Sequence, residues 1–319
     1  MNMIRTLKDA VHVRCLGRAV LTATMIGFAM VTAATAQQSF KTPQEAVETF
    51  VTAVRAGDRK AVNAILGPGA EQIISSGDAV QDENTRKVFL ASYDAKHSVD
   101  TSGDKQATLL IGPDGYPFAI PIVNKDGSWM FDTVAGRVEV LARRIGRNEL
   151  AAIQVCLAYY DAQYEYAETM PKVDDMAVYA QRVVSRPGKK DGLYWPAGEG
   201  AEPSPLGESV AYASRRGYRV GSGEAFHGYY YRILTRQGPK APGGAHDFIV
   251  DGKMIGGFAL IAWPAEYGNS GITTFLISHD GIVYEKDLGK DTRKIASNTT
   301  AFNPDDTWRK VEVDIAEKK

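Results

Sequence analysis

Histidines and carboxylates in the last third of the chain are the residues whose types could bind a transition metal. The set consists of His227, His246, His279, Asp247, Asp280 and Asp287. Zinc uses imidazole and carboxylate ligands, but zinc motifs normally place two ligands at a short, fixed spacing. These residues form no H-x3-H pair, so solvated side chains beside turns are the favoured interpretation. We predict no metal site.

Other chemical motifs are equally weak in this sequence. No G-x-S-x-G nucleophile elbow occurs, and the glycine-rich turns at 238–244 and 252–257 do not open a helix, as a phosphate-binding loop would. Asp287, Gly289 and Asp291 offer oxygen atoms for calcium, yet the other ligands of a calcium loop are missing. The sequence therefore leans against an enzyme and predicts no cofactor.

Residues 1–36 have the pattern of a cleaved secretory signal. The basic residues that open it are Arg5, Lys8, Arg14 and Arg18. A mostly apolar run, 19–34, follows, and Ala34 and Ala36 are small residues at the two positions that signal peptidase recognises. We expect Gln37 to begin a mature protein that is periplasmic or secreted. The apolar run is shorter than the ~20 residues of a membrane span, so we expect no span after cleavage, and an uncleaved anchor is the alternative.

Cleavage would change the charge and the cysteine count. The full chain carries a net charge of −1, and the signal holds four basic residues and one acidic residue, so the mature chain is mildly acidic. Such a chain has no general electrostatic attraction for nucleic acid. Cys15 would leave with the signal, so no intramolecular disulfide can form. The remaining Cys156 lies on an apolar helix stripe, where a buried hydrophobe is favoured over a reactive thiol.

Helices followed by strands are predicted for residues 37–137. Thr42, Pro43 and Glu45 have the pattern of a capped helix start, and the apolar residues that follow share one helical face up to Gly57. Further helices are predicted over 59–66, around 73–74 and over 82–97. The apolar contacts expected on the last of these are Val88, Phe89 and Tyr93. Strands are predicted over 107–111, 118–123 and 128–132, the last two joined by an Asp-Gly hairpin turn.

This first part resembles the nuclear-transport-factor-2-like cone fold. The resemblance rests on the opening TPQEAVETFVTAVRAGD and the strand GSWMFDT, and it implies helices packed on a curled antiparallel sheet. Enzymes of that fold hold paired acids with a tyrosine, histidine or arginine inside the cone. The matching candidates here are Asp94, His97, Asp132 and Arg137. Solvated helix ends account for these residues at least as well, and a fold alone assigns no function.

A long helix is predicted from Val138 to the residue before Pro171. Its apolar stripe consists of Ile153, Cys156, Leu157, Tyr160 and Tyr164. A short helix over 174–184 should follow, and then a Gly/Pro-rich loop over 185–207, which is long enough to be functional or mobile. Tyr194 and Trp195 lie within this loop. We favour a packing anchor for these two aromatics and keep a binding surface as the alternative.

The rest of the chain alternates strands and glycine turns. Strands are predicted over 229–235, 247–250, 256–263, 272–278 and 282–286, the first of them as a central strand. Four or five antiparallel strands preceded by a long helix indicate an α+β unit. Function is expected at the rim of this sheet, where the loops that follow Gly238 and Trp263 meet the long loop.

Two further resemblances rest on residues of the C-terminal part, and the first of them covers nearly the whole mature chain. The stretches IGRNELAAIQVCLAYYDAQYEYA and YYYRILTRQGPKAPGGAHDFIVDGKMIGGFALIAWPAEYGNSGITTFLISHDGIVYEKDLG closely resemble an exported bacterial family known as domain of unknown function 2950. The long helix followed by a glycine-punctuated sheet is also similar to the globular half of type IV pilins and pseudopilins. The N-terminal segment lacks the pilin processing site, which puts assembly into a filament in doubt.

The sequence thus predicts an α+β protein of two domains, 37–137 and 138–319. We expect a binding or envelope-associated interaction module whose partner is an envelope protein or a glycan. The candidate binding residues are Tyr194, Trp195, His246, Trp263 and Tyr267. The alternatives are a hydrolase that uses a pocket in the cone-like domain, and a structural accessory of a pilus or secretion apparatus.

Overall fold

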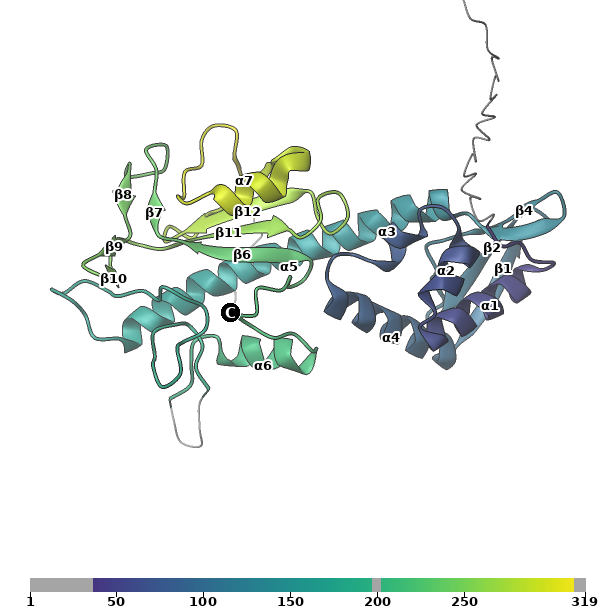
Figure 1. The fold of residues 1–319 in the computed structure, drawn as a ribbon, viewed down its shortest axis with the longest axis horizontal. Helices are drawn as coiled ribbons and strands as arrows, with labels where there is room; N and C mark the ends of the chain where they lie inside the picture. Colours follow the sequence, from purple (N-terminus) through teal and green to yellow (C-terminus); the bar gives the residue numbers. More distant parts are fainter. Residues whose placement is uncertain (1–36, 197–201, 313–319) are drawn as a thin grey trace, which may run out of the picture. The chain divides into compact units, whose positions relative to one another are not determined.

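The protein is described by a computed structural model that covers residues 37–196 and 202–312 (Figure 1). Helices and antiparallel sheets alternate along the chain, which confirms the predicted α+β class. The expected signal, with Ala34 and Ala36, lies outside the described residues. None of the described helices combines the length and the apolar character that crossing a membrane requires.

Four helices precede the first described strand. They are α1 (Pro43–Ala56), α2 (Arg59–Leu66), α3 (Ala70–Ile74) and α4 (Ala79–Ala95). The predicted start of α1 is confirmed, because Thr42 Oγ1 accepts a hydrogen bond from the Glu45 backbone N–H at 3.1 Å, and Glu45 Oε2 accepts one from the Lys41 N–H at 2.9 Å. Gly57 ends α1 in a left-handed conformation at φ +67°, which glycine adopts without a steric penalty.

The first sheet is antiparallel and follows these helices. Its strands are β1 (His97–Ser102), β2 (Gln106–Ile111), β3 (Tyr116–Pro117), β4 (Ile122–Lys125) and β5 (Ser128–Phe131). The order is β1-β2-β4-β5, with β3 paired to β2. The predicted hairpin joins β4 to β5, and its turn residues Asp126 and Gly127 have φ values of 54° and 83°, as a type I′ turn requires.

Two predictions about α4 are wrong. The helix was expected to reach His97, but it ends at Ala95, and His97 begins β1, a mostly exposed strand without an apolar alternation to reveal it. Val88 was expected to face the core, yet its side chain is 66% exposed. Phe89 and Tyr93 do pack against the core, as predicted.

An aromatic core fills the space between these helices and the first sheet. The Phe50 ring lies 5.9 Å from Phe89, 5.6 Å from Phe118 and 5.1 Å from Phe131, measured between ring centroids. Such spacings give favourable edge and tilted contacts in addition to the area that the rings bury. Phe131 is the last residue of β5, so this core also fixes the place where the next helix begins.

The long helix α5 (Thr133–Thr169) begins five residues before the predicted Val138. Asp132 Oδ1 accepts a hydrogen bond from the Ala135 N–H at 3.1 Å and so caps the helix. Cys156 and Tyr159 in its second half are buried in a second core, whereas Tyr164, expected on the same stripe, is 38% exposed. Burial raises the pKa of the Cys156 thiol to about 12, so this cysteine is a core residue, as the sequence indicated.

The connection after α5 differs from the prediction. Residues 174–184 form no helix, because Asp174 and Asp175 adopt φ values of 48° and 64° in a tight turn closed by a bridge between Val173 and Met176. A helix that was not predicted, α6 (Gly207–Arg215), follows the described part of the long loop. A parallel β-bridge also joins Val184, just before that loop, to Tyr194 inside it.

The C-terminal sheet contains most of the second core. Its strands are β6 (Tyr229–Leu234), β11 (Ala259–Pro264), β12 (Thr273–Ser278), β13 (Val283–Asp287) and β14 (Arg309–Lys310). The order is β14-β13-β12-β11-β6, so β6 is an edge strand among the described residues and not the predicted central one. Two small hairpins extend this part: β7 (Arg236–Gln237) pairs with β8 (His246–Asp247), and β9 (Ile249–Val250) pairs with β10 (Lys253–Met254).

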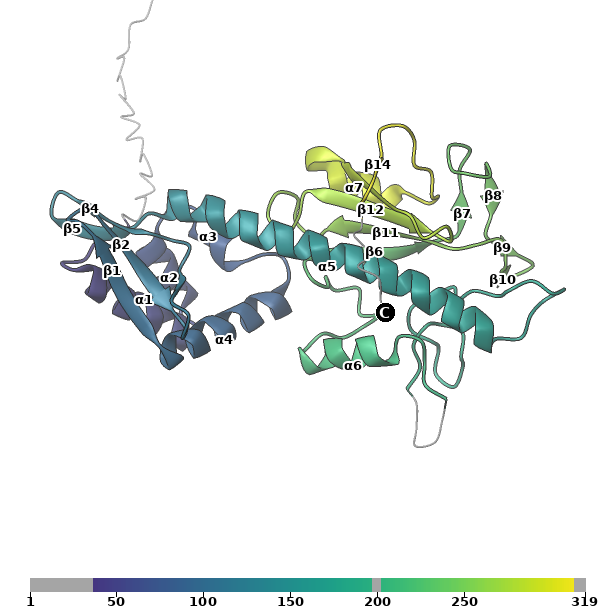
Figure 2. The same ribbon diagram turned by 180° about the vertical axis from the view of Figure 1, so that it is seen from behind.

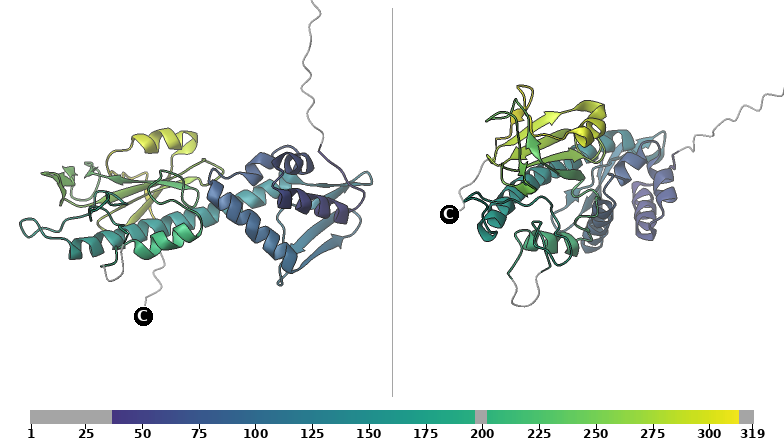
Figure 3. Two further views of the ribbon diagram at one scale, coloured as in Figure 1. Left: turned by 60° about the horizontal axis from the view of Figure 1, so that its bottom comes forward. Right: turned by 60° about the vertical axis from the view of Figure 1, so that its left-hand side comes forward.

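Helices cover both faces of this sheet. The second half of α5 packs on β11 and β12, and α7 (Thr292–Asn298), preceded by the 3-10 turn η1 (Gly289–Asp291), packs on β11 from the other side (Figures 2 and 3). Every residue of β11 is therefore buried. This explains the unbroken apolar run at 259–264, since a strand covered on both faces does not alternate with polar residues.

Two glycines of α5 allow a matched test of this packing. A Cβ at Gly136 would lie 2.8 Å from the Ile120 Cα, whereas a Cβ at Gly146 would meet nothing within 4 Å. We expect Gly136→Ala to lower the free energy of unfolding by about 1–3 kcal/mol through overpacking. Gly146→Ala should raise it by about 0.5–1 kcal/mol through helix propensity. Urea denaturation of both variants measures this, and equal effects would contradict the close approach of α5 to the segment before β4.

Candidate functional site

A buried polar cluster joins α4 and α5 to two loops of the C-terminal part. We call it the polar junction, and it consists of Asp78, Arg144, Asn148, Tyr218 and Asn269. Asp78 is 2% exposed. Its Oδ1 accepts a hydrogen bond from the Gln81 N–H at 2.9 Å and so caps α4, while its Oδ2 accepts from the Tyr218 hydroxyl at 2.9 Å and the Gly228 N–H at 3.0 Å. One carboxylate thus connects α4 to a segment more than a hundred residues away in the sequence.

Arg144 connects α5 to the end of α3. Its guanidinium donates hydrogen bonds to the backbone carbonyls of Gln72 and Ile73, the former at 2.8 Å, and to the side-chain oxygen of Asn269. These carbonyls belong to the last turn of α3, where helical carbonyls lack partners within the helix and a cation is favourable. Burial lowers the pKa of Arg144, and the nearby Asp82 carboxylate opposes that effect. The guanidinium remains charged and serves as a helix cap.

Asn148 and Asn269 complete the cluster. Asn148 accepts a hydrogen bond from the Gln81 side chain at 2.8 Å and donates one to the Ser270 carbonyl at 2.9 Å. Asn269 donates to the Ser75 carbonyl at 2.9 Å. A Cβ at Gly228 would lie 2.4 Å from the Asn148 amide nitrogen, and Gly228 has φ +74°, so glycine is required there for two reasons.

Burial shifts the titration of the groups around this cluster. It raises the pKa of Asp82 and lowers the pKa of His227, although Asp78 partly counteracts the second effect. Burial and the neighbouring Asp78 carboxylate also raise the pKa of Tyr218. Shifted groups that gather in one place are typical of functional sites and also of structural ion networks. Because both Asp78 oxygens already accept hydrogen bonds within the protein, we assign the polar junction a positioning role.

The outward side of the first half of α5 is apolar, and most of its residues are exposed. The α5 apolar face consists of Val134, Ala135, Val138, Leu141, Ala142, Ile145 and Gly146, whose spacing places them on one side of the helix. Val134 is 70% exposed and Val138 68%. A contiguous apolar patch of this kind differs from the scattered single hydrophobic residues that protein surfaces normally show.

The four candidate acid–base residues make separate local contacts. Asp94 forms an exposed ion pair with Arg55 at 2.6 Å. His97 stacks on Tyr93 and hydrogen-bonds to its backbone carbonyl at 2.9 Å. The Arg55 guanidinium holds the pKa of Asp94 below its usual range, with a smaller contribution from His97, so these two candidates lie near each other.

The other two candidates lie at the start of α5. Asp132 caps the helix, and Arg137 donates a hydrogen bond to the Gln72 side chain at 3.0 Å. Among the described residues, no hydrogen bond or ion pair links the two candidates at the start of α5 to Asp94 on α4 and His97 on β1. The apolar core of Phe50 and its neighbours occupies the space between the helices and the sheet. A shared catalytic pocket for the four therefore stays a prediction.

One of the two aromatics in the long loop, Trp195, belongs to the core. Trp195 is 6% exposed, packs within the second core and donates a hydrogen bond to the Glu202 carbonyl at 3.3 Å. Lys190 lies over its indole ring at 5.1 Å. Tyr194 is partly exposed, and its backbone pairs with Val183 and Ser185. The burial of Trp195 fits the anchor role that the sequence favoured, and a binding role for Tyr194 stays a prediction.

The remaining candidate binding residues lie on β11, in the loop after it and on β8, which are different places in the C-terminal part. Trp263 is 8% exposed on β11. Tyr267 donates a hydrogen bond from its hydroxyl to Asp287 at 3.2 Å. His246 is exposed and hydrogen-bonds to the Gly256 carbonyl at 3.0 Å. No contact among the described residues joins these three into one surface.

The three C-terminal histidines divide between two places. His246 and His279 both pack against Phe248, with ring centroids 5.5 and 5.8 Å from it, whereas His227 lies against Phe226 beside the polar junction. Within residues 37–196 and 202–312, no three histidine, cysteine or carboxylate side chains come together as metal ligands would.

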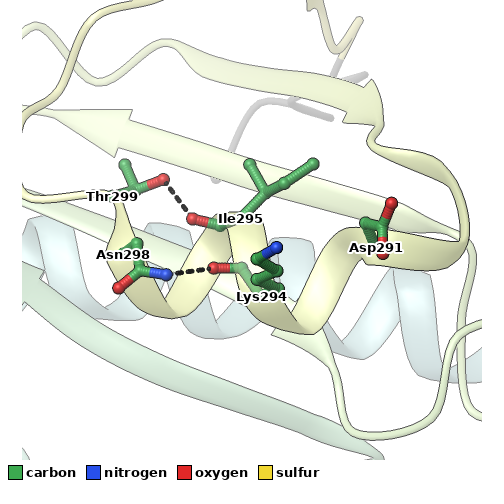
Figure 4. Close-up of a pocket in the computed structure, with 5 residues that line it drawn as sticks. All are labelled: Asp291, Lys294, Ile295, Asn298 and Thr299. Carbon is green, nitrogen blue, oxygen red and sulfur yellow. Dashed lines mark hydrogen bonds between the residues drawn. The ribbon is translucent and has the colours of Figure 1, made fainter. Parts of the chain in front are cut away.

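An open depression of about 370 Å³ lies along α7 (Figure 4). It is lined by Asp291, Lys294, Ile295, Asn298 and Thr299. The Asn298 and Thr299 side chains bond back to the carbonyls of Lys294 and Ile295 at 2.8 and 3.0 Å. Their polar groups thus complete the end of α7, and the depression has no buried polar group aimed into it.

Comparison with known proteins identifies the family. Residues 37–311 match the family described as protein of unknown function DUF2950, and the chain belongs to that family. No curated protein and no solved structure matches this chain. The resemblances to the cone fold and to pilin heads therefore remain predictions.

The residues of the polar junction were not identified from the sequence. Asp78 precedes a helix and follows Ser76-Gly77, so its capping role was detectable. Its contacts to Tyr218 and Gly228 had no sequence signal, because they join positions far apart in the chain. Both valines of the α5 apolar face are apparent as apolar residues in the sequence. Val134, however, precedes the predicted start of the long helix, and Val138 coincides with it.

Replacing Asp78 tests the polar junction. We expect Asp78→Asn to lower the free energy of unfolding by about 1–3 kcal/mol. The NH2 group of the amide is a donor and would face the N–H and O–H donors that now share the two carboxylate oxygens. The matched control is Asp58→Asn, since Asp58 is exposed and caps α2 through a single bond to the Ala61 N–H. Asn caps helices as well as Asp, so this control should change stability by less than about 0.5 kcal/mol. Equal losses in denaturation experiments would refute the special role of Asp78.

Proposed function

We propose that this protein is an exported interaction module that binds a protein partner through the α5 apolar face. The observation that carries the proposal is the exposure of Val134 and Val138 at 70% and 68% on a helix whose other side is buried. Amphipathic helices normally bury their apolar side, and an apolar patch left in water is a typical protein-binding surface.

The surroundings of this face support binding to a protein. Glu139 and Arg143 flank it and form an ion pair with each other at 2.6 Å, and interfaces commonly combine an apolar centre with a charged rim. Glycan sites, in contrast, would need polar groups that converge on a ligand. We therefore favour a protein over a glycan as the envelope partner.

Export is the second part of the proposal and rests on the sequence of residues 1–36. The basic start, the apolar run and the small residues Ala34 and Ala36 are the features that signal peptidase and the export machinery recognise. The protein would then work in the periplasm or outside the cell.

Export predicts a defined mature protein. We expect the cell-envelope or secreted fraction to contain a chain that begins at Gln37, as measured by intact mass and N-terminal sequencing. Replacing Ala34 and Ala36 by bulky residues should block processing and leave the longer chain attached to the membrane. An unprocessed wild-type chain in the cytosol would overturn this part of the proposal.

Binding through α5 predicts position-specific crosslinks. A photoreactive amino acid in place of Val138 should yield a protein adduct in intact cells, and Val134→Gln in the same chain should weaken the adduct. Gln is a better helix former than Val, so this change should leave the fold intact. The matched control carries the photoreactive group in place of Val88, an equally exposed valine on α4. An adduct no stronger at 138 than at 88 would refute the proposed surface.

A further inference from the structure

We propose that the partner of the α5 apolar face is a second copy of this chain, bound with the two α5 helices antiparallel. This inference rests on the proposed function, because it names the partner of the surface described there. Two observations carry it: the alternation of large and small side chains along the face, and the position of one acidic and one basic residue on its flank.

The large and small side chains are arranged in a self-complementary order. A two-fold axis perpendicular to α5 near Val140 places Ala135 opposite Ile145 of the partner subunit, and Val138 opposite Ala142 of the partner subunit. In these two pairs a large side chain faces a small one, and the symmetry repeats both contacts, while Leu141 beside the axis faces Leu141 of the partner subunit. A parallel pair would instead place Val138 against its own equivalent and Ala142 against its own equivalent, leaving large side chains opposed at one level and a gap at the next.

The flanking charges favour the same arrangement. Glu139 and Arg143 lie on one flank of the face, one turn apart. In an antiparallel pair related by this axis, equal flanks of the two helices meet. Glu139 therefore lies near Arg143 of the partner subunit, and Arg143 near Glu139 of the partner subunit. These opposite charges add orientation and specificity to the apolar contact.

The size of the face sets the strength of the dimer. Thirteen residues from Val134 to Gly146 extend over about 18 Å of helix. Such a contact is smaller than the roughly 1,600 Å² of a standard stable interface, so we expect a reversible dimer with a Kd on the order of micromolar.

Sedimentation of the purified chain from Gln37 over a range of concentrations tests the dimer. We expect the wild type to shift from monomer to dimer, and Val138→Gln to raise the Kd at least about tenfold. Glu139→Arg and Arg143→Glu should each weaken the dimer, and the double charge exchange should restore it. Val88→Gln should leave the Kd unchanged. Circular dichroism and thermal unfolding verify that each variant is folded.

Disulfide crosslinking tests the orientation. An equal mixture of Val138→Cys and Ala142→Cys chains should form the mixed dimer faster than either variant alone forms its own, because antiparallel pairing brings positions 138 and 142 together. The native Cys156 is buried and should not compete. Faster homodimer formation by Val138→Cys would refute the antiparallel arrangement.

The outcomes also separate this inference from the proposed function. A purified chain that stays monomeric at all concentrations, together with a crosslink from position 138 to a different protein in cells, would overturn the inference and preserve the proposed function. A monomeric chain without any specific crosslink at 138 would overturn both. A crosslinked species of twice the chain mass, together with charge-exchange rescue, would support both.

Discussion

A carboxylate buried away from water must find its hydrogen bonds within the protein, because an unpaired buried charge costs several kcal/mol. Asp78 meets this requirement with three donors drawn from α4, the segment before β6 and the turn at Gly228. The contacts cannot be made separately, since losing any one of these elements would leave a buried donor or acceptor unpaired. The carboxylate therefore couples the order of the first part of the chain to that of the second.

The same constraint divides α5 into an inward and an outward side. Arg144 and Asn148 project from the inward side into the polar junction, and Gly136 lies against Ile120 further along that side. These contacts fix the rotation of the helix about its own axis, because turning Arg144 or Asn148 outward would break their hydrogen bonds. The α5 apolar face is consequently held toward solvent, so it is a rigid surface that pays little ordering entropy on binding.

Local chemistry made much of the fold predictable, and long-range contacts made the rest unpredictable. Caps such as Thr42, Asp-Gly turns and unbroken apolar runs depend on a few neighbouring residues, and the elements that rely on them were predicted correctly. The 174–184 segment failed because two consecutive aspartates adopt left-handed conformations that its helical pattern did not reveal. β6 was predicted to be central from its apolar and aromatic composition. Composition indicates that a strand is buried, but it does not indicate which strands lie beside it. The polar junction was missed for a related reason, since its partners are separated by up to 150 residues.

The candidate chemical residues and the α5 apolar face differ in how their interactions are satisfied. Asp94, Asp132 and Arg137 already form bonds within the chain. Asp94 forms an ion pair, Asp132 caps α5, and Arg137 donates a hydrogen bond to a side chain. Val134 and Val138 have no such compensation, and each Å² of their exposed apolar surface forgoes about 25 cal/mol that burial would provide. Free energy for association is thus available from these two valines without breaking any contact within the chain, whereas recruiting Asp94, Asp132 or Arg137 would first require breaking existing bonds. This asymmetry is the physical reason to place function on the surface of α5.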